Sequence, residues 1–192
     1  MTTRSLPRSY FENLYAPDPD PWRFATSLYE RDKYLRTLAA LRRPIYASAL
    51  EAGCSIGVLT RQLAARCESL TAFDIASAPL VEARRRCDDI SWVRFERLNA
   101  PSEWPAGNFD LILLSEIVYY LDRQDIRRLA TRIEESLARN GDLLLVHWTG
   151  PTDYPMSGDD AVESLLRDLQ GVVSVIHSDR AENFRLDLAG RG

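Results

Sequence analysis

The chain contains few cysteines, and their number and spacing exclude two kinds of stabilising site. Its three cysteines are Cys54, Cys67 and Cys87. They are odd in number, and no two of them form a Cys-x-x-Cys pair. Such a set predicts neither a disulfide framework nor a zinc site. We therefore expect a fold that is held by its hydrophobic core, and we predict no metal site.

The sequence also lacks long hydrophobic runs and an excess of basic residues. Its longest apolar stretches, such as residues 111–114 and 143–146, are far too short to span a bilayer. No apolar run follows the polar N-terminus, so no signal peptide is indicated. The net charge of −4 at pH 7 disfavours binding to nucleic-acid phosphates. We expect a cytoplasmic protein, a monomer or a homodimer, that binds neither membranes nor nucleic acid.

Neither an internal repeat nor a low-complexity linker is present, and 192 residues suit one ordinary domain. We divide this single predicted domain into three parts. Residues 1–41 are expected to form helices, the second of which begins with the capping-box spacing of Ser27 and Glu30. Residues 45–150 form the core. Residues 151–192 form a helix and a β-hairpin.

Apolar runs and helical patterns alternate through the core. The apolar runs predict strands at residues 47–50, 70–74, 92–95, 109–115 and 143–148, and two later runs at 172–177 and 184–188 predict the hairpin. Helical spacing predicts a helix over residues 58–67. A second helix begins at a capping Ser77, and a third runs from a capping Asp122 to a stop at Asn140-Gly141. This alternation is typical of parallel βαβ units. The expected fold class is α/β, a mostly parallel seven-stranded Rossmann-like sheet with helices on both faces and a C-terminal β-hairpin.

The exit of the first strand reads Glu51-x-Gly53-x-Ser55-x-Gly57 and opens directly into a helix. Glycines let the backbone turn sharply and approach a ligand. Asp74 ends the second strand, where a carboxylate can accept hydrogen bonds from both ribose hydroxyls. A tight turn followed by a capping aspartate would give the same pattern. The spacing does not match the Gly-x-Gly-x-x-Gly dinucleotide fingerprint, and Glu51 suits a ligand with an ammonium and a sulfonium better than a diphosphate.

At this point the chain resembles a known enzyme class. Residues 51–57, 73–75, 109–116 and 140–145 are similar to the successive motifs of class I methyltransferases. The resemblance implies their fold and their cofactor, S-adenosyl-L-methionine. It implies a cofactor site that includes Glu51, Gly53, Ser55, Gly57, Asp74, Ile75, Asn99, Ala100 and Ser115. Asn99 departs from the more usual acidic residue, but its carbonyl can still accept a hydrogen bond from the adenine amino group.

Three further segments resemble a narrower group. Asp-Pro-Trp-Arg at residues 20–23, Tyr-Glu-Arg at 29–31 and the segment 115–121 are similar to the NodS-like nodulation N-methyltransferases, which act on de-N-acetylated chitooligosaccharides. This resemblance implies N-methylation of an amino sugar or a related oligosaccharide. N- or O-methylation of another small metabolite stays open, because the C-terminal segment does not resemble these enzymes.

Two residues are candidates for catalysis, and two others for a lid. Glu116 follows the fourth strand and can pair with an amine, and His147 ends the fifth strand, where a base of near-neutral pKa is useful. Residues 1–41 are rich in aromatic side chains, as expected of a lid over the cofactor. Trp22 would then contact the cofactor and Arg31 its carboxylate. Structural roles are the alternative: a packed His147, and an Arg31 paired with a surface acid.

Three other functions compete with methylation of a small molecule. A nicotinamide-dependent oxidoreductase would use the same loop and Asp74. A non-catalytic methyltransferase fold would bind the cofactor or have lost it, although Gly53, Gly57 and Asp74 are all present. Methylation of nucleic acid is disfavoured, because neither a basic stripe nor a base-flipping Asn-Pro-Pro-Tyr motif occurs.

Overall fold

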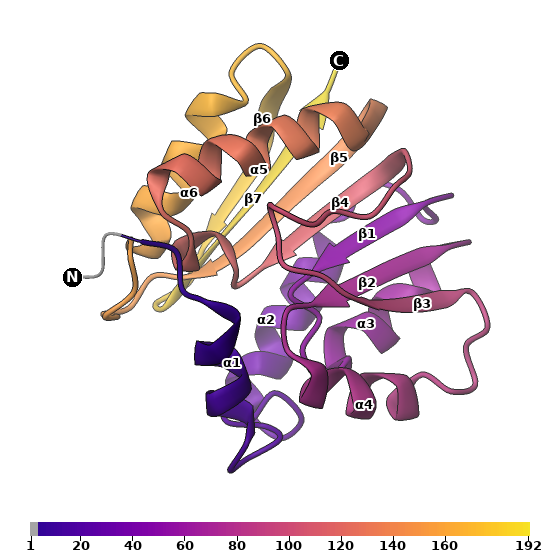
Figure 1. The fold of residues 1–192 in the computed structure, drawn as a ribbon. Coiled ribbons are helices and arrows are strands. Elements are labelled where there is room, and N and C mark those ends of the chain that lie inside the picture. Colours follow the sequence, from indigo (N-terminus) through magenta and orange to yellow (C-terminus); the bar gives the residue numbers. More distant parts are fainter. Residues whose placement is uncertain (1–3) are drawn as a thin grey trace.

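The computed structural model describes residues 4–192 and contains one seven-stranded sheet with the strand order β3-β2-β1-β4-β5-β7-β6 (Figure 1). The strands are β1 (Ala49–Ala52), β2 (Leu70–Asp74), β3 (Val93–Arg97), β4 (Phe109–Ser115), β5 (Leu137–Trp148), β6 (Val173–Arg180) and β7 (Phe184–Arg191). The first five pair in parallel, and β7 pairs antiparallel with both β5 and β6. The predicted parallel sheet and C-terminal hairpin are confirmed.

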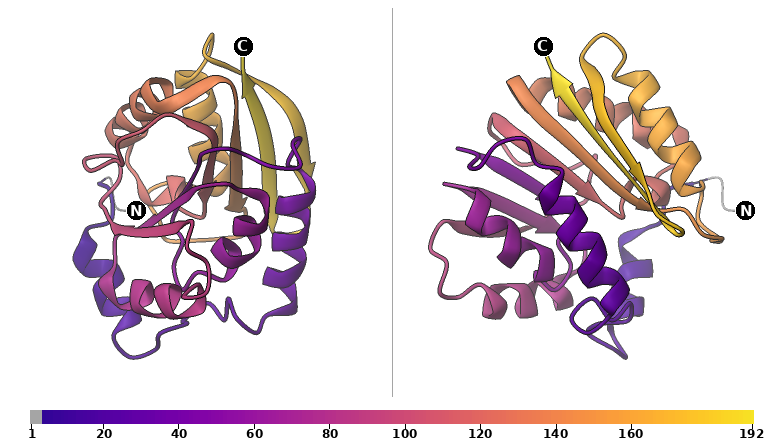
Figure 2. Two further views of the ribbon diagram at one scale, coloured as in Figure 1. Left: turned by 90° about the vertical axis from the view of Figure 1, so that its right-hand side faces the viewer. Right: turned by 180° about the vertical axis from the view of Figure 1, so that it is seen from behind.

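Helices cover both faces of this sheet (Figure 2). They are α1 (Arg8–Tyr15), α2 (Leu28–Ala39), α3 (Val58–Leu63), α4 (Ser77–Arg86), α5 (Arg123–Ser136) and α6 (Gly158–Asp168), with short 3₁₀ helices η1 (Ala64–Arg66) and η2 (Val118–Tyr120). No helix within residues 4–192 is both long enough and apolar enough to cross a bilayer.

The alternation of side chains along β4 explains why nearly all of this strand is apolar. Ile112 and Leu114 belong to a hydrophobic core with α5 and α6, whereas Leu111 and Leu113 belong to the core on the opposite face with α2 and α3. All four side chains are fully buried. A strand that is covered on both faces has no position left for a polar side chain that faces solvent.

Two predicted helix boundaries are wrong. Asp122 does cap α5, accepting hydrogen bonds from two backbone N–H groups. The helix ends at Ser136, however, and Asn140, with a left-handed φ of 60°, lies within β5, where the pairing with β4 changes register. Ser77 is the first residue of α4 rather than its cap. Its backbone N–H and hydroxyl donate to the carboxylate of Glu12 in α1, so Ser77 joins two helices.

The N-terminal helices reach both faces of the sheet from the edge at which the parallel strands end (Figures 1 and 2). Phe11 and Tyr15 of α1 pack into the core on one face, and Tyr34 of α2 packs into the core on the other. Ser27 caps α2 as predicted, accepting a hydrogen bond from the backbone N–H of Glu30 at 3.3 Å. The segment before β1 therefore passes the carboxyl ends of the strands, where ligands bind in open α/β sheets.

Candidate functional site

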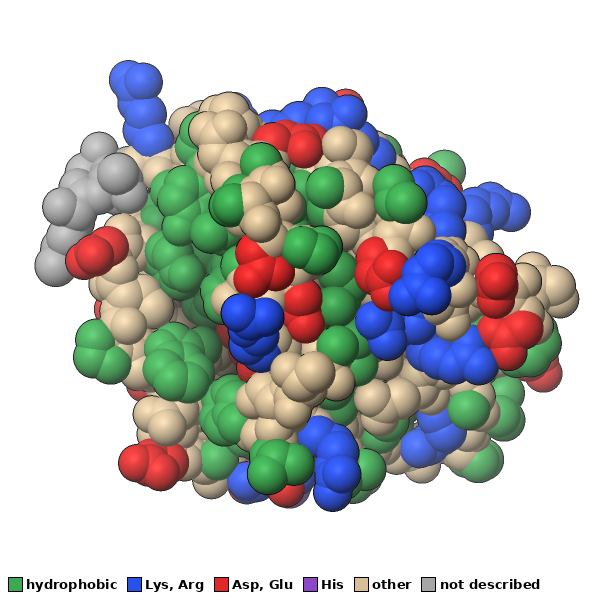
Figure 3. Space-filling view, turned by 90° about the horizontal axis from the view of Figure 1, so that it is seen from below, with side chains coloured by type: hydrophobic (Ala, Val, Ile, Leu, Met, Phe, Trp, Pro, Cys, Tyr) green, Lys and Arg blue, Asp and Glu red, His purple; other side chains and the backbone are tan. Residues whose placement is uncertain are grey.

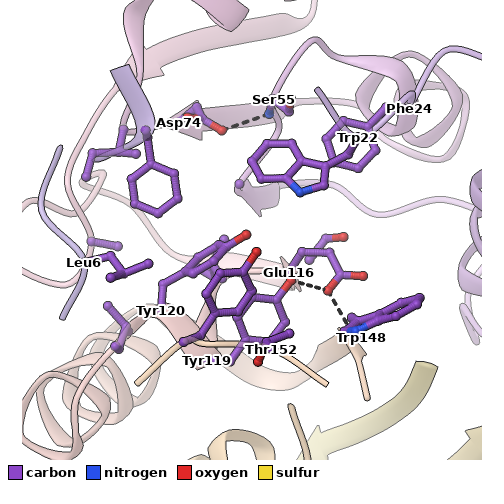
Figure 4. Close-up of a pocket in the computed structure, with 18 of the residues that line it drawn as sticks. Leu6, Trp22, Phe24, Ser55, Asp74, Glu116, Tyr119, Tyr120, Trp148 and Thr152 are labelled. Atoms are coloured by element: carbon purple, nitrogen blue, oxygen red, sulfur yellow. Dashed lines mark hydrogen bonds between the residues drawn. The ribbon is translucent and has the colours of Figure 1, made fainter. Parts of the chain in front are cut away.

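A cavity of about 440 Å³ lies at the carboxyl ends of the parallel strands, between them and the N-terminal segment. Figure 3 shows the surface of the molecule from below the view of Figure 1. Hydrophobic side chains gather on one part of this surface, and acidic and basic side chains are concentrated on another. Inside the cavity, Ser55 and Asp74 lie on one side, and Glu116, Tyr119 and Trp148 lie across from them (Figure 4). The cavity thus has two ends with different chemistry.

The loop after β1 has the backbone geometry that its glycines predict. Gly53, Ser55 and Gly57 all have positive φ, at 82°, 45° and 75°. A Cβ on Gly53 would lie 2.7 Å from the carbonyl oxygen of Ser115, and one on Gly57 would lie 2.9 Å from the Cα of Ala83. The glycines therefore permit close packing between parts of the protein itself, whether or not a ligand approaches them.

Asp74 holds this loop from the end of β2. Its carboxylate accepts hydrogen bonds from the backbone N–H groups of Ser55, at 3.0 Å, and Ala76, at 2.9 Å. Burial raises the pKa of Asp74 to about 6. Asp74 also lines the cavity together with Ile75 and Asn99. This end of the cavity therefore presents a carboxylate, an amide and apolar side chains, a set that suits a nucleoside.

Glu51 lies beside the main cavity rather than in it. It lines a small adjoining niche of about 30 Å³ together with Glu30, Lys33 and Tyr34. Its side chain is 1% exposed, and its Oε2 atom has no hydrogen-bond partner within residues 4–192. Burial raises the pKa of Glu51 to about 7. A buried carboxylate with a free oxygen can receive a donor from a ligand.

Glu116 is the centre of the opposite end. Its Oε1 accepts a hydrogen bond from Lys33 at 2.6 Å, and its Oε2 accepts bonds from the Tyr119 hydroxyl at 2.6 Å and the Trp148 backbone N–H at 2.8 Å. Burial alone would raise the pKa of Glu116, but Lys33, His147 and the hydrogen bond from Tyr119 lower it below its ordinary value. Its φ of 59° is unfavourable for a residue with a Cβ. The side-chain bonds hold it in this conformation.

Aromatic side chains enclose the Glu116 end of the cavity. Tyr119 stacks on Tyr154 with ring centroids 5.2 Å apart, and Tyr120 meets the same ring edge-on at 4.7 Å. Tyr29 of α2 contacts Trp148 at 5.7 Å. All five side chains line the cavity. Rings of this kind exclude water from the Glu116 carboxylate, and one of them, Tyr119, also donates its hydroxyl to it.

The structure brings most of the predicted site residues together. Those that line the main cavity are Trp22, Gly53, Ser55, Asp74, Ile75, Asn99, Ala100, Ser115 and Glu116. Glu51 lines the adjoining niche, and Gly57 is the N-cap residue of α3 and packs against α4.

Arg31 and His147 do not line the cavity. The Arg31 side chain is exposed, because α2 turns it away from the face that carries Lys33. His147 is fully buried behind the site, and its Nε2 accepts the backbone N–H of Val118 at 3.2 Å. Burial lowers the pKa of His147 to about 4. Neither position fits the role predicted from the sequence, which for Arg31 was carboxylate binding and for His147 was general base.

Lys33 is the functional candidate that the sequence reasoning missed. It is the single lysine among 24 basic residues. Its side chain is 2% exposed and lies between the carboxylates of Glu30, at 2.9 Å, and Glu116, at 2.6 Å. The rarity of lysine in a chain rich in arginine was the available signal. Among residues 4–192, no group of three or more His, Cys, Asp or Glu side chains is arranged to hold a metal ion.

Solved methyltransferase structures share this fold. A crystal structure of a candidate methyltransferase from Pseudomonas syringae superposes with a TM-score of 0.75 at 36% identity, covering 86% of this chain and all of that one. The N-methyltransferase NodS from Bradyrhizobium japonicum WM9, solved in complex with S-adenosyl-L-homocysteine, gives a TM-score of 0.81 at 23% identity, covering 96% of this chain and 97% of that one. The predicted class I methyltransferase fold is confirmed.

Sequence comparison identifies the family. Nodulation protein S from Bradyrhizobium diazoefficiens is 39% identical over 108 residues, which are 53% of this chain and 49% of that protein. The chain spans about half the length of the curated relatives it matches. The sequence profile of Nodulation protein S (NodS) matches residues 12–147, which include every strand from β1 to β4 and nearly all of β5. The chain therefore belongs to the NodS family.

Proposed function

We propose that the chain is an S-adenosyl-L-methionine-dependent N-methyltransferase whose acceptor is an amine, and specifically an amino sugar or a de-N-acetylated chitooligosaccharide. The observation that carries this proposal is the charge of the site. Among the described residues, four carboxylates line the cavity and its niche, and one lysine is the only basic side chain. Cofactor and acceptor would both bring positive charge, as a sulfonium and as an ammonium. A hydroxyl acceptor would gain less from such a site.

The residues at the β1 and β2 ends fit the cofactor. Asp74 would accept the ribose hydroxyls, and Asn99 would accept the adenine amino group beside Ile75. The free Oε2 of Glu51 is the matching partner for an ammonium near the loop. When bound, the cofactor supplies a methyl group on a positively charged sulfur. The protein's part is to hold an acceptor nitrogen in line with that group.

Glu116 would orient the acceptor. Its carboxylate is fixed by three donors, and its lowered pKa keeps it ionised near neutral pH. Such a carboxylate is a weak base but a strong partner for an ammonium. Holding the nitrogen at a set distance and excluding water can account for much of the rate of a methyl transfer. The acceptor must still lose a proton before its nitrogen attacks, and the buried, neutral His147 is poorly placed to take it.

The test has a binding arm and a transfer arm. Calorimetry should detect binding of S-adenosyl-L-homocysteine to the protein and no binding of NAD. Transfer of a labelled methyl group should then occur to oligomers of glucosamine and not to their fully N-acetylated counterparts, which have the same sugar rings and no amine. Binding of NAD instead of S-adenosyl-L-homocysteine would refute the cofactor. Equal methylation of the N-acetylated sugars would refute the amine acceptor.

A further inference from the structure

Lys33 and Glu116 form an ion pair inside the cavity, at the position where an acceptor ammonium would bind. The Lys33 Nζ lies 2.6 Å from Glu116 Oε1 and 2.9 Å from Glu30 Oε1. Burial alone would lower the pKa of Lys33, but the two carboxylates raise it above its ordinary value. Lys33 is therefore a charged alkylammonium, which is the same chemical group as a protonated primary amine acceptor.

The bonds of Glu116 leave a second cation one place to bind. Oε2 already accepts two donors, the Tyr119 hydroxyl and the Trp148 N–H, and these belong to the wall of the site. Oε1 accepts only Lys33. A second donor can still approach Oε1, but an ammonium there would lie beside the Lys33 ammonium, and the repulsion between the two like charges opposes binding both at once.

Glu30 provides an alternative hydrogen-bond acceptor for the Lys33 ammonium. The side chain of Glu30 is 8% exposed, and its Oε2 has no hydrogen-bond partner within residues 4–192. The niche of about 30 Å³ beside it is lined by Glu30, Lys33 and Glu51, whose Oε2 is also unpartnered. This volume is enough for an ammonium group, which is close to a water molecule in size. If Lys33 left Glu116, it would gain new acceptors in place of the one it lost.

We infer that Lys33 holds the acceptor-ammonium position at Glu116 Oε1 when no acceptor is bound, and that an acceptor ammonium displaces it toward Glu30. The inference rests on the proposed amine acceptor. The exchange keeps Glu116 ionised at all times, because a buried carboxylate without a cation is costly and would take up a proton. It also selects against neutral groups, because a hydroxyl or an acetamide cannot replace the charge of Lys33. Lys33 is thus a specificity-determining residue of the acceptor site.

The single lysine makes this exchange directly observable. Protein labelled with ¹³C in lysine has one Cε signal, which belongs to Lys33. Ethylammonium is a probe that carries the reactive group without a sugar, and ethanol is its neutral control. We expect ethylammonium to shift the Lys33 signal in a saturable way and ethanol to leave it in place. The shifted signal should approach that of the Glu116→Gln variant, in which Lys33 keeps Glu30 as its only charged partner. A Lys33 signal that ethylammonium does not move would overturn the inference.

A variant of Glu30 tests the second half of the exchange. Glu30→Gln removes the charge that receives Lys33, so ethylammonium should bind about tenfold more weakly, while affinity for S-adenosyl-L-homocysteine changes by less than about threefold. Glu135→Gln on the exposed surface of α5 is the matched control. Unchanged ethylammonium affinity in Glu30→Gln would refute the receiving role of Glu30. If ethylammonium shifts the Lys33 signal but glucosamine oligomers are not methylated, the exchange at Glu116 is supported and the proposed sugar acceptor is refuted.

Discussion

The side-chain oxygens of Tyr15 and Ser55 lie 2.5 Å apart, and this buried contact joins α1 to the loop after β1 across 40 residues of sequence. Ser55 also donates its backbone N–H to Asp74 at 3.0 Å. In the same helix, Glu12 accepts two hydrogen bonds from Ser77 at the start of α4. We propose on this basis that α1 is the part of the N-terminal segment that closes over the cofactor.

Tyr15→Phe should weaken binding of S-adenosyl-L-homocysteine and loosen α1. Loss of one buried hydrogen bond costs about 1 kcal/mol, which corresponds to roughly a fivefold change in affinity. Calorimetry measures the affinity, and amide hydrogen exchange over residues 8–15 measures the opening of α1. Tyr10→Phe is the control, because Tyr10 lies in the same helix and is 37% exposed. Equal behaviour of the two variants would show that the Tyr15 hydroxyl does not hold the lid.

Asp74→Ala should weaken binding of S-adenosyl-L-homocysteine at least tenfold, or by about 1.4 kcal/mol or more. The variant removes the proposed ribose partner and also frees the Ser55 N–H that the carboxylate accepts. Isothermal calorimetry on the folded variant gives the affinity.

Asp110→Asn provides the matched control for Asp74→Asn. The Asp110 carboxylate also accepts two backbone N–H groups, those of Ala47 at 3.0 Å and Ser48 at 2.9 Å, but it lies near the start of β4, away from the cavity. Only Asp74→Asn should lose affinity, and Asp110→Asn should bind S-adenosyl-L-homocysteine as tightly as the unsubstituted protein. If the two bind S-adenosyl-L-homocysteine equally well, Asp74 is a capping residue and no more.

Glu51→Gln should make the protein more stable above neutral pH. Burial raises the pKa of Glu51 from 4.5 to about 7, so the folded state holds a proton that the unfolded state has released. Its stabilising contribution is complete below pH 4.5 and is lost as the pH rises through 7. The uncharged Gln avoids this loss, which amounts to about 3 kcal/mol for a shift of this size. Urea unfolding of both proteins on either side of this pH window measures it. Parallel stability curves would contradict the assigned shift.

His147→Ala should lower stability and leave the pH dependence of turnover unchanged between pH 6 and 7. Burial lowers the pKa of His147 to about 4, so the side chain does not titrate in this window while the protein is folded. The variant leaves the Val118 N–H without its acceptor, which costs about 1–3 kcal/mol. A titration of kcat near pH 6.5 that disappears in His147→Ala would restore His147 as the general base.

The sequence determined the fold class and which residues lie at the β1 and β2 end of the cavity, because both depend on local patterns. An apolar run such as residues 109–115 indicates a strand covered on both faces, and the residues that follow consecutive parallel strands necessarily meet at one edge. Glu51, Gly53 and Asp74 could therefore be placed near one another before any coordinates were known. Local patterns were less reliable at element ends. Asn140 adopts the expected left-handed conformation, but it does so inside β5 rather than at the end of α5.

The tertiary structure alone decided the arrangement around Glu116. Lys33 and Glu116 are 83 residues apart, and no spacing rule connects a helix in the N-terminal segment with the end of β4. Burial, which is also a property of the folded chain, decided the protonation chemistry of His147. The ordinary pKa of histidine made His147 look like a base, but full burial lowers its pKa to about 4, and its Nε2 already accepts the Val118 N–H. Contacts between distant segments and exclusion of water are properties of the folded chain, so the charge distribution around Glu116 exists only when the chain has folded.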